Sequence, residues 1–146
     1  MITKQTLNSP IGVFDSGLGG LTVLKSLKKI LPNESFIYFG DIAHVPYGTK
    51  SAERVISYSQ LIMDFFLKHK TKAVVIACNT ASAVAFQHLK RIYDIPLFDV
   101  ITPSVEYSMN ITKTRKIGVI GTYSTIQSNA YKWVFKNLGD TCNVQE

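Results

Sequence analysis

The sequence has 146 residues, of which 46% are hydrophobic and 18% charged. This is enough for a folded domain with a real core, and it excludes an intrinsically disordered chain. The net charge of +6 would suit nucleic acid, a membrane surface or an anionic small molecule as a partner. The basic residues are scattered, however, and form no block of about five or six like charges. We therefore predict no nucleic-acid partner.

Apolar runs alternate with helical patterns through the first part of the chain. Short apolar runs predict strands at residues 10–14, 36–39, 73–77 and 96–100. Apolar side chains at helical spacing predict helices between them, at residues 21–31, 51–66 (with Ser51 as the cap) and 79–93. This order predicts an α/β fold whose parallel sheet is covered by helices on both faces, in three αβα layers.

The pattern then begins again. Residues 101–104 predict a hinge or a helix start, followed by a helix, a strand and a helix at 105–111, 116–120 and 125–138. Ile-Gly-Val opens both this strand and the first one, which indicates either an internal duplication or a coincidence. We predict two domains, a first over residues 1–100 and the start of a second over residues 101–146.

The second predicted domain has too few elements to cover a sheet on two faces. Either the chain is a truncated piece, or it completes itself with a partner copy. Such a chain would expose apolar surface, so we expect a homo-oligomer.

Nothing in the sequence predicts export. Residues 1–10 lack the apolar run of a signal peptide, and no stretch of about 18 apolar residues is present to cross a membrane. Cys78 and Cys142 are therefore expected to be free thiols in a reducing compartment. We predict a cytoplasmic protein with no membrane partner.

Polar side chains directly follow several of the predicted strands, at residues 15–17, 41–48, 78–80 and 121–125. The carboxyl ends of parallel strands meet at one edge of a sheet, and ligands bind there in open α/β sheets. The sequence therefore predicts one crevice formed by these turns.

Cys78 and Asp15 are the candidates for chemistry in this crevice. Cys78 follows a strand and abuts a helix N-terminus, which favours the thiolate form, and Asn79 and Thr80 add hydrogen-bond donors. The alternative for Cys78 is a buried, inert thiol. Asp15 lies one residue past an apolar strand, where it could orient or deprotonate a neighbour, or simply cap the following turn.

Two further features of the sequence bear on function. The glycines at 17–20 have the spacing GxGG rather than GxGxxG, so they do not predict a dinucleotide site. Their free backbone amides could face an anion such as a carboxylate. Alternatively, these glycines could form only a tight turn. His44 could reach the crevice and serve a cysteine hydrolase. The spacings CxxC and HxxxH are absent, so no metal site is predicted.

Four segments carry a resemblance to a known family: FDSGLGGLTVLKSL, GDIAHVPYGTKS, VIACNTASA and GTYSTIQSNAY. In this order and spacing they resemble the glutamate racemases of the aspartate/glutamate racemase superfamily, from Pro10 to about Leu138. The resemblance implies interconversion of L- and D-glutamate for peptidoglycan synthesis, without pyridoxal phosphate, any other cofactor or a metal. It also implies two similar α/β domains with the active site between them.

The resemblance also implies roles for individual residues. Two cysteines flank the substrate α-carbon in this family, and Cys78 corresponds to the one that acts on D-glutamate, assisted by Asp15. The substrate's carboxylates and amine would be bound by Ser16, Asn79, Thr80, Thr122 and Thr125. Tyr47 and Gly48 would line the pocket.

The sequence departs from the family pattern in several places. The second catalytic cysteine belongs to a Gly-Cys-Thr-His segment that lies well beyond residue 146, and Cys142 lacks the Thr-His neighbours. His44 stands where arginine is usual, Asp99 where glycine is usual and Thr102 where glutamate is common, and we expect the charge of Asp99 to strain the crossover between domains. The expectation is a truncated glutamate racemase that is inactive alone. The alternatives are a non-catalytic module that binds dicarboxylate amino acids, and a self-associating half-enzyme.

Overall fold

The computed structural model describes residues 7–139 and 141–146, so the first six residues of the predicted 1–100 domain lie outside it. The first group of elements is β1 (Ile11–Asp15), α1 (Leu21–Ile30), β2 (Phe36–Gly40), the 3₁₀ turn η1 (Tyr47–Thr49), α2 (Ala52–Lys68), β3 (Ala73–Ile76), α3 (Asn79–Ile92) and β4 (Leu97–Asp99). The second group is α4 (Ile101–Ile111), β5 (Lys116–Gly118), α5 (Tyr123–Gln127), α6 (Ala130–Asn137) and β6 (Asn143–Gln145).

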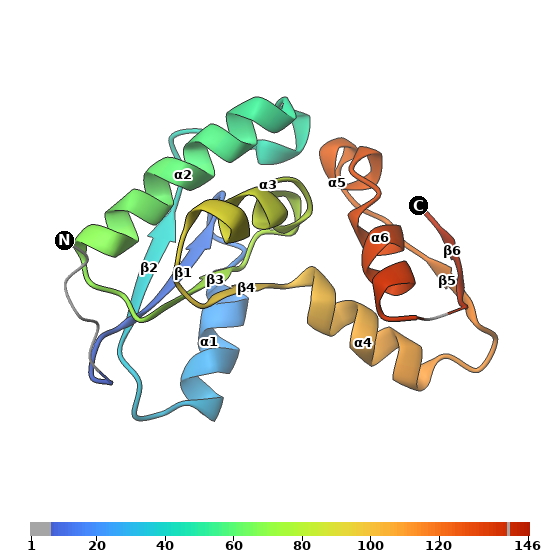
Figure 1. Cartoon of the computed structure of the whole chain (residues 1–146), viewed down its shortest axis with the longest axis horizontal. Helices are drawn as coiled ribbons and strands as arrows, with labels where there is room; N and C mark the ends of the chain where they lie inside the picture. Colours follow the sequence, from blue (N-terminus) through green and yellow to red (C-terminus); the bar gives the residue numbers. More distant parts are fainter. Residues whose placement is uncertain (1–6, 140) are drawn as a thin grey trace.

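The first group forms a four-stranded parallel sheet in the order β2-β1-β3-β4. Helices α2 and α3 lie on one face of this sheet and α1 lies on the other (Figure 1). Parallel neighbours require crossover connections, and the helices predicted between the strands supply them. The predicted α/β class with a parallel sheet is therefore confirmed.

The main core lies between the sheet and helices α2 and α3. Phe14 of β1 and Phe66 of α2 are fully buried there, with their ring centroids 6.4 Å apart. Gly12 makes room for this contact, because a Cβ atom at that position would lie 2.8 Å from the Phe66 ring. The missing side chain of Gly12 lets the large ring lie directly against the strand.

The second group forms a smaller assembly beside the first (Figure 1). Strands β5 and β6 form a two-stranded parallel sheet, and α4 packs on α6 through Ile101, Val105, Val134 and Phe135. The structure thus contains two separate clusters of buried apolar residues, one for each sheet.

The sequence-based boundaries were wrong at the helix predicted over residues 125–138. The structure has two helices there, because Asn129 adopts the left-handed conformation with φ 52° between α5 and α6. The Ser128 hydroxyl accepts a hydrogen bond from the Ala130 amide at 3.2 Å and so helps to start α6. The short side chain of Ser satisfies a free amide, and Asn tolerates positive φ better than most residues do.

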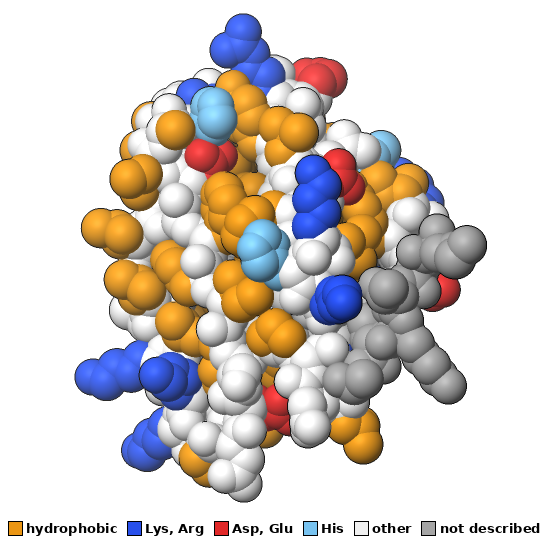
Figure 2. All heavy atoms as spheres, turned by 90° about the vertical axis from the view of Figure 1, so that its left-hand side faces the viewer, with side chains coloured by type: hydrophobic (Ala, Val, Ile, Leu, Met, Phe, Trp, Pro, Cys, Tyr) orange, Lys and Arg blue, Asp and Glu red, His pale blue; other side chains and the backbone are white. Residues whose placement is uncertain are grey.

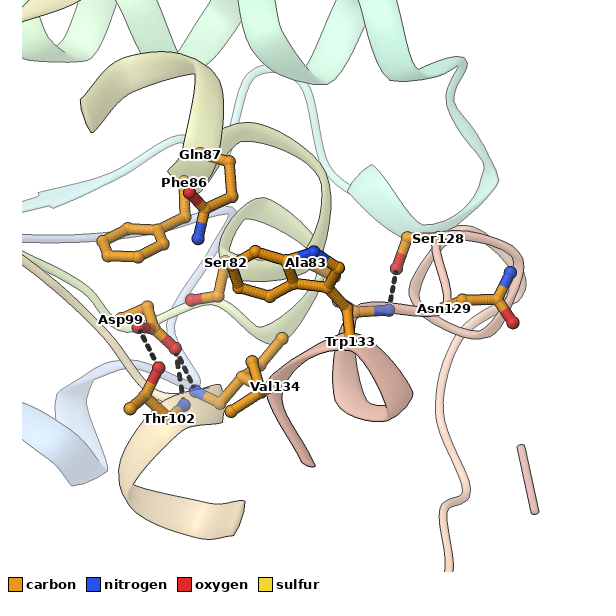
Figure 3. Close-up of a pocket in the computed structure, with 12 residues that line it drawn as sticks. Ser82, Ala83, Phe86, Gln87, Asp99, Thr102, Ser128, Asn129, Trp133 and Val134 are labelled. Carbon is orange, nitrogen blue, oxygen red and sulfur yellow. Dashed lines mark hydrogen bonds between the residues drawn. The ribbon is translucent and has the colours of Figure 1, made fainter. Parts of the chain in front are cut away.

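Asp99 does not strain the chain, contrary to the expectation from the sequence. Its Oδ1 accepts hydrogen bonds from the amides of Ile101 and Thr102 at 2.6 and 2.7 Å, and its Oδ2 accepts one from the Thr102 hydroxyl at 2.8 Å (Figure 3). A carboxylate at a helix N-terminus satisfies free amides and interacts favourably with the helix dipole. Residues 101–104 therefore form the start of α4, and the side chains of Asp99 and Thr102 are hydrogen-bonded to each other.

Replacing Asp99 with alanine is expected to lower the free energy of unfolding by about 1–2 kcal/mol, because the amides at the start of α4 lose their partner. Thr102→Val removes only the side-chain bond and should cost less. Urea unfolding followed by circular dichroism measures both, and equal stability of Asp99→Ala and the wild type would contradict this role of the carboxylate.

Charged side chains are dispersed over the face drawn in Figure 2, where Lys and Arg side chains lie in separate groups among hydrophobic ones. Among the described residues of this face, the basic side chains are not gathered into one continuous surface. Within the described residues, no helix combines the length and apolar character needed to cross a membrane.

Candidate active site

The carboxyl ends of β1 and β3 bring Asp15, Ser16 and Cys78 together. The Cys78 thiol donates to the Ser16 hydroxyl at 3.4 Å, although 62 positions separate the two residues in sequence. Parallel pairing of β1 with β3 causes this approach, because it places the ends of both strands at the same edge. The strand ends therefore bring these three residues together, and a ligand-binding crevice around the thiol stays a prediction.

Cys78 is the N-cap residue of α3, and only 6% of its surface is exposed. Its sulfur accepts a hydrogen bond from the Ala81 amide at 3.5 Å, so the first turn of α3 points a donor at the thiol. Cys78 thus lies at a helix N-terminus and is buried in this structure. Cys78 also belongs to the main core cluster, so its position is fixed by packing.

Asp15 caps the turn that follows β1. Its Oδ2 accepts hydrogen bonds from the amides of Gly17 and Gly20, at 3.2 and 3.0 Å. This corrects the expectation that these amides are free to face a bound anion, because the carboxylate of the chain itself occupies them. Gly20 is required for the arrangement, since a Cβ atom there would lie 2.7 Å from Cβ of Asp15 and 2.9 Å from Cβ of Ala77.

The pKa of Tyr38 is sensitive to the charged groups at this edge of the sheet. Its hydroxyl donates to the carbonyl oxygen of Gly17 at 2.9 Å. Burial raises the pKa of Tyr38, and the negative charges of Asp15 and Cys78 raise it further. The electrostatic effects of Asp15 and Cys78 both reach the Tyr38 hydroxyl, which agrees with the two side chains lying close together.

Three threonine hydroxyls join the two groups of elements. Thr80 at the start of α3 lies 2.9 Å from Thr122 and 3.3 Å from Thr125, and the latter two are 2.9 Å apart, measured between hydroxyl oxygens. Each hydroxyl both donates and accepts, so the cluster can redirect its protons toward a ligand's carboxylate. Thr80 is the member of this cluster that directly follows Asn79 and lies two residues beyond Cys78 in the chain.

Asn79 is held by a residue that the sequence analysis did not single out. The Tyr131 hydroxyl of α6 donates to Asn79 Oδ1 at 2.8 Å, which leaves the amide group of Asn79 available as a donor. Burial raises the pKa of Tyr131, with further contributions from Asp99 and Glu146. Tyr131 lies 52 positions from Asn79, so no local pattern could have revealed the pair.

Tyr47 and Gly48 do not line an open pocket in this structure. Tyr47 is 1% exposed, and its hydroxyl donates to the carboxylate of buried Asp41 at 2.6 Å. Gly48 is covered by Thr122, whose Cβ would lie 2.5 Å from a Cβ placed on the glycine. The Ser124 hydroxyl donates to the carbonyl oxygen of Gly48 at 2.9 Å, so the loop and α5 are closed onto each other. A ligand could contact Gly48 only if Thr122 moved away.

The family of the chain is decided by its match to known proteins. Residues 11–145 match the family described as Asp/Glu/Hydantoin racemase. The chain belongs to this family. Its members among the curated relatives include the glutamate racemase of Enterococcus faecalis, 48% identical over 134 residues, and that of Aquifex aeolicus, 46% identical over 129 residues.

The fold agrees with solved structures of family members. Glutamate racemase isoform RacE1 from Bacillus anthracis superposes with a TM-score of 0.92 at 42% identity, covering 96% of this chain and 53% of that protein. Glutamate racemase from Francisella tularensis, solved in complex with D-glutamate, superposes with a TM-score of 0.84 at 46% identity, covering 94% and 51%. The chain spans about half the length of its relatives: the region matched to the Enterococcus faecalis protein covers 92% of this chain but only 49% of that protein.

His44 is held away from the role of a hydrolase base. Its Nδ1 lies 2.8 Å from Asp41 Oδ1, and its ring stacks on Tyr58 with a centroid distance of 4.0 Å. No hydrogen bond joins His44 to Cys78 within the described residues, so the hydrolase hypothesis has no geometric support.

Among the described residues, no group of three or more His, Cys, Asp or Glu side chains is placed to hold a metal ion.

Cys142 is not a second thiol for this site. It packs in the second apolar cluster, whereas Cys78 belongs to the first, and its sulfur lies 3.9 Å from Nη1 of Arg115. Both cysteines are free thiols.

Tyr47→Phe is expected to lower the free energy of unfolding by about 1.5–3 kcal/mol, because it removes a buried hydrogen bond to the charged carboxylate of Asp41 without changing ring packing. Tyr123→Phe is the matched control on exposed α5, 73% exposed, and should change stability by less than about 0.5 kcal/mol. Denaturant unfolding of both variants would contradict the prediction if their losses were equal.

The same pair predicts an alkaline pH dependence. Burial raises the pKa of Tyr47, and the hydrogen bond and negative charge of Asp41 raise it further. The stabilisation is therefore present below the unfolded tyrosine pKa of about 10 and is lost as pH rises above it. Unfolding measured from neutral pH to above pH ~10 should show the deficit of Tyr47→Phe shrinking, and a constant deficit would contradict this linkage.

Proposed function

We propose that this chain forms one half of a glutamate racemase site, in which Cys78 is the acid–base group for the α-proton of D-glutamate. The observation that carries the proposal is the placement of the Cys78 sulfur between the Ser16 hydroxyl and the Ala81 amide, at the strand ends where Asp15 also lies. The relative from Francisella tularensis was solved with D-glutamate, which supports this substrate.

The chemistry is a proton transfer. The Cys78 thiolate takes the α-proton of D-glutamate and becomes a thiol, while the electron pair of the C–H bond delocalises into the substrate carboxylate. Donors around that carboxylate stabilise the developing charge, and the proposed donors are Ser16, Asn79, Thr80, Thr122 and Thr125. Asp15 would assist by orienting the thiol and its surroundings. No step requires a cofactor or a metal.

Racemisation needs a second proton donor on the opposite face of the α-carbon. Cys142 is packed in the second apolar cluster and does not supply it. We therefore propose that the chain alone returns a proton to the same face, so that it exchanges the α-hydrogen of D-glutamate with solvent without producing L-glutamate. We further propose that the complete reaction takes place in the cytoplasm and supplies D-glutamate for peptidoglycan.

The test is an incubation with D-glutamate and, separately, with L-glutamate in deuterium oxide. Proton NMR follows loss of the α-hydrogen signal, and chiral chromatography measures the other enantiomer. Exchange of D-glutamate alone, with no racemisation, is the expected result. Efficient two-way racemisation would overturn the one-thiol mechanism, because it needs an acid on each face.

A non-catalytic dicarboxylate-binding module is the second candidate. The burial of Cys78 in the main core favours it, because a buried cysteine is ordinarily an inert packing residue. Calorimetry with D-glutamate distinguishes the two functions. Binding without any α-hydrogen exchange would support the module and contradict the catalytic proposal.

A further inference from the structure

Asn79 differs from its neighbours at the start of α3 in being open to solvent. Cys78 before it and Thr80 after it are buried, whereas Asn79 is exposed. The side-chain amide of asparagine has a carbonyl oxygen that accepts hydrogen bonds and an NH2 group that donates two. The end of this amide that faces a ligand therefore decides which chemical groups Asn79 can bind.

The phenol of Tyr131 sets this orientation from α6. Its hydroxyl donates to Asn79 Oδ1 at 2.8 Å, so the carbonyl end of the amide is occupied and the NH2 end is left to donate. Within the described residues, Asn79 Oδ1 is the acceptor that this phenol has. A reversed amide would turn its NH2 group toward the phenol and leave the phenol proton without that acceptor, which is unfavourable for a half-buried hydroxyl.

Tyr131 also keeps the proton that it donates. Burial raises the pKa of Tyr131, and the negative charges of Asp99 and Glu146 raise it further. Asp99 ends β4 and Glu146 directly follows β6, so acidic groups from both sheets act on this phenol. The hydroxyl therefore remains a hydrogen-bond donor well above neutral pH.

The contact between Tyr131 and Asn79 has no duplicate. Among the described residues, no other hydrogen bond joins a side chain of α3 to one of α6. A cavity of about 280 Å³ lies between the two helices, and its lining includes Ala83 and Gln87 of α3 and Ala130 and Trp133 of α6 (Figure 3). Another side chain of these helices would therefore not replace the Tyr131 hydroxyl if it were removed.

We propose that Tyr131 is a specificity-determining residue, which holds Asn79 as a donor so that the site favours a carboxylate over the corresponding carboxamide. The inference rests on the proposed binding of D-glutamate. A carboxylate only accepts hydrogen bonds, so it matches the NH2 end of Asn79. A carboxamide has both a carbonyl oxygen and an NH2 group, so it can satisfy either orientation of Asn79. Tyr131 acts through Asn79 and is a positioning residue.

Tyr131→Phe tests this role, because it removes the hydroxyl, keeps the ring and lets the Asn79 amide reverse. Calorimetry compares D-glutamate with D-glutamine and D-isoglutamine, the amides of its two carboxylates. The variant should bind D-glutamate about threefold to tenfold more weakly. Its preference for D-glutamate over at least one of the amides should shrink by a similar factor. A general loosening of the site would instead weaken all three ligands together and keep their ratios.

Tyr107→Phe is the matched control, because it removes a phenol hydroxyl from a 67% exposed position on α4. Its affinities for the three ligands should equal those of the wild type. Circular dichroism verifies that both variants keep their fold. If Tyr131→Phe retains the full preference of the wild type for D-glutamate over both amides, the role of Tyr131 is overturned.

The side-chain NH2 signal of Asn79 gives a readout that needs no ligand. Heteronuclear NMR of the isotope-labelled chain assigns this signal by its loss in Asn79→Asp. The signal should shift in Tyr131→Phe and stay in place in Tyr107→Phe, and an unmoved signal in Tyr131→Phe would overturn the positioning contact. A wild-type chain that binds no D-glutamate would overturn the proposed function and the specificity role together, whereas binding with an unchanged preference overturns the role of Tyr131 alone.

Discussion

Replacing Cys78 with serine is expected to reduce exchange of the α-hydrogen of D-glutamate by about 10²–10⁴-fold, which is the usual contribution of a positioned acid–base group. Serine keeps the shape and the hydrogen bond to Ser16, but its hydroxyl is far less acidic than a thiol. The loss should therefore appear in the exchange rate and not in substrate affinity. Proton NMR in deuterium oxide measures the rate, and calorimetry measures the affinity.

Cys142→Ser is the matched control for this prediction, because it alters the other free thiol, in the second apolar cluster. Its exchange rate should equal that of the wild type. A Cys78→Ser variant with undiminished exchange would remove the thiol from the mechanism, whereas a loss in both variants would indicate a general effect on the fold.

Most of the fold was predictable because the apolar patterns along the sequence match the strands and helices of the parallel sheet. The apolar run at β3 predicted a strand covered on both faces, and the strand is present, but only its α2/α3 face is buried. The second face, on which α1 lies, is only partly buried in the structure. Continuous apolar character alone cannot reveal which element supplies the cover.

The site was predictable to the extent that it lies at strand ends. Asp15, Ser16 and Cys78 could be placed from their positions after apolar runs, because parallel strands bring their carboxyl ends together. The residues that hold the others in place could not be found this way. Tyr131 and Ser124 act across 52 and about 75 positions of sequence, through contacts that exist only after the second group has packed on the first.

The wrong predictions concern helix ends, at Asp99 and between α5 and α6, where the residues responsible are close together in the sequence. Asp99 and Thr102 form a short-range pair at a helix start, and Ser128 with Asn129 forms a break between helices. Both are capping patterns, in which a polar side chain satisfies nearby amides. Apolar periodicity continues across both positions, so periodicity alone does not predict these helix boundaries.

Replacing Phe66 with alanine is expected to be the most destabilising single change, lowering the free energy of unfolding by about 3–5 kcal/mol. Phe66 is fully buried on α2, its ring lies 5.6 Å from that of Phe65 and 6.4 Å from that of Phe14, and its ring atoms approach the position where Gly12 lacks a side chain. The strand backbone at Gly12 offers no side chain that could fill the vacated space. A cavity would therefore remain in the core.

Leu61→Ala on the same helix is the control for Phe66→Ala, since Leu61 is 63% exposed and loses little burial. Urea unfolding at neutral pH should show a small shift for Leu61→Ala and a large one for Phe66→Ala. A loss of about 3–5 kcal/mol is a large part of the 5–15 kcal/mol that holds a typical domain together, so Phe66→Ala should also lose D-glutamate binding as the sheet edge around Cys78 loosens. Binding that survives a loss of this size would show that the edge carrying Cys78 is held independently of the α2 core.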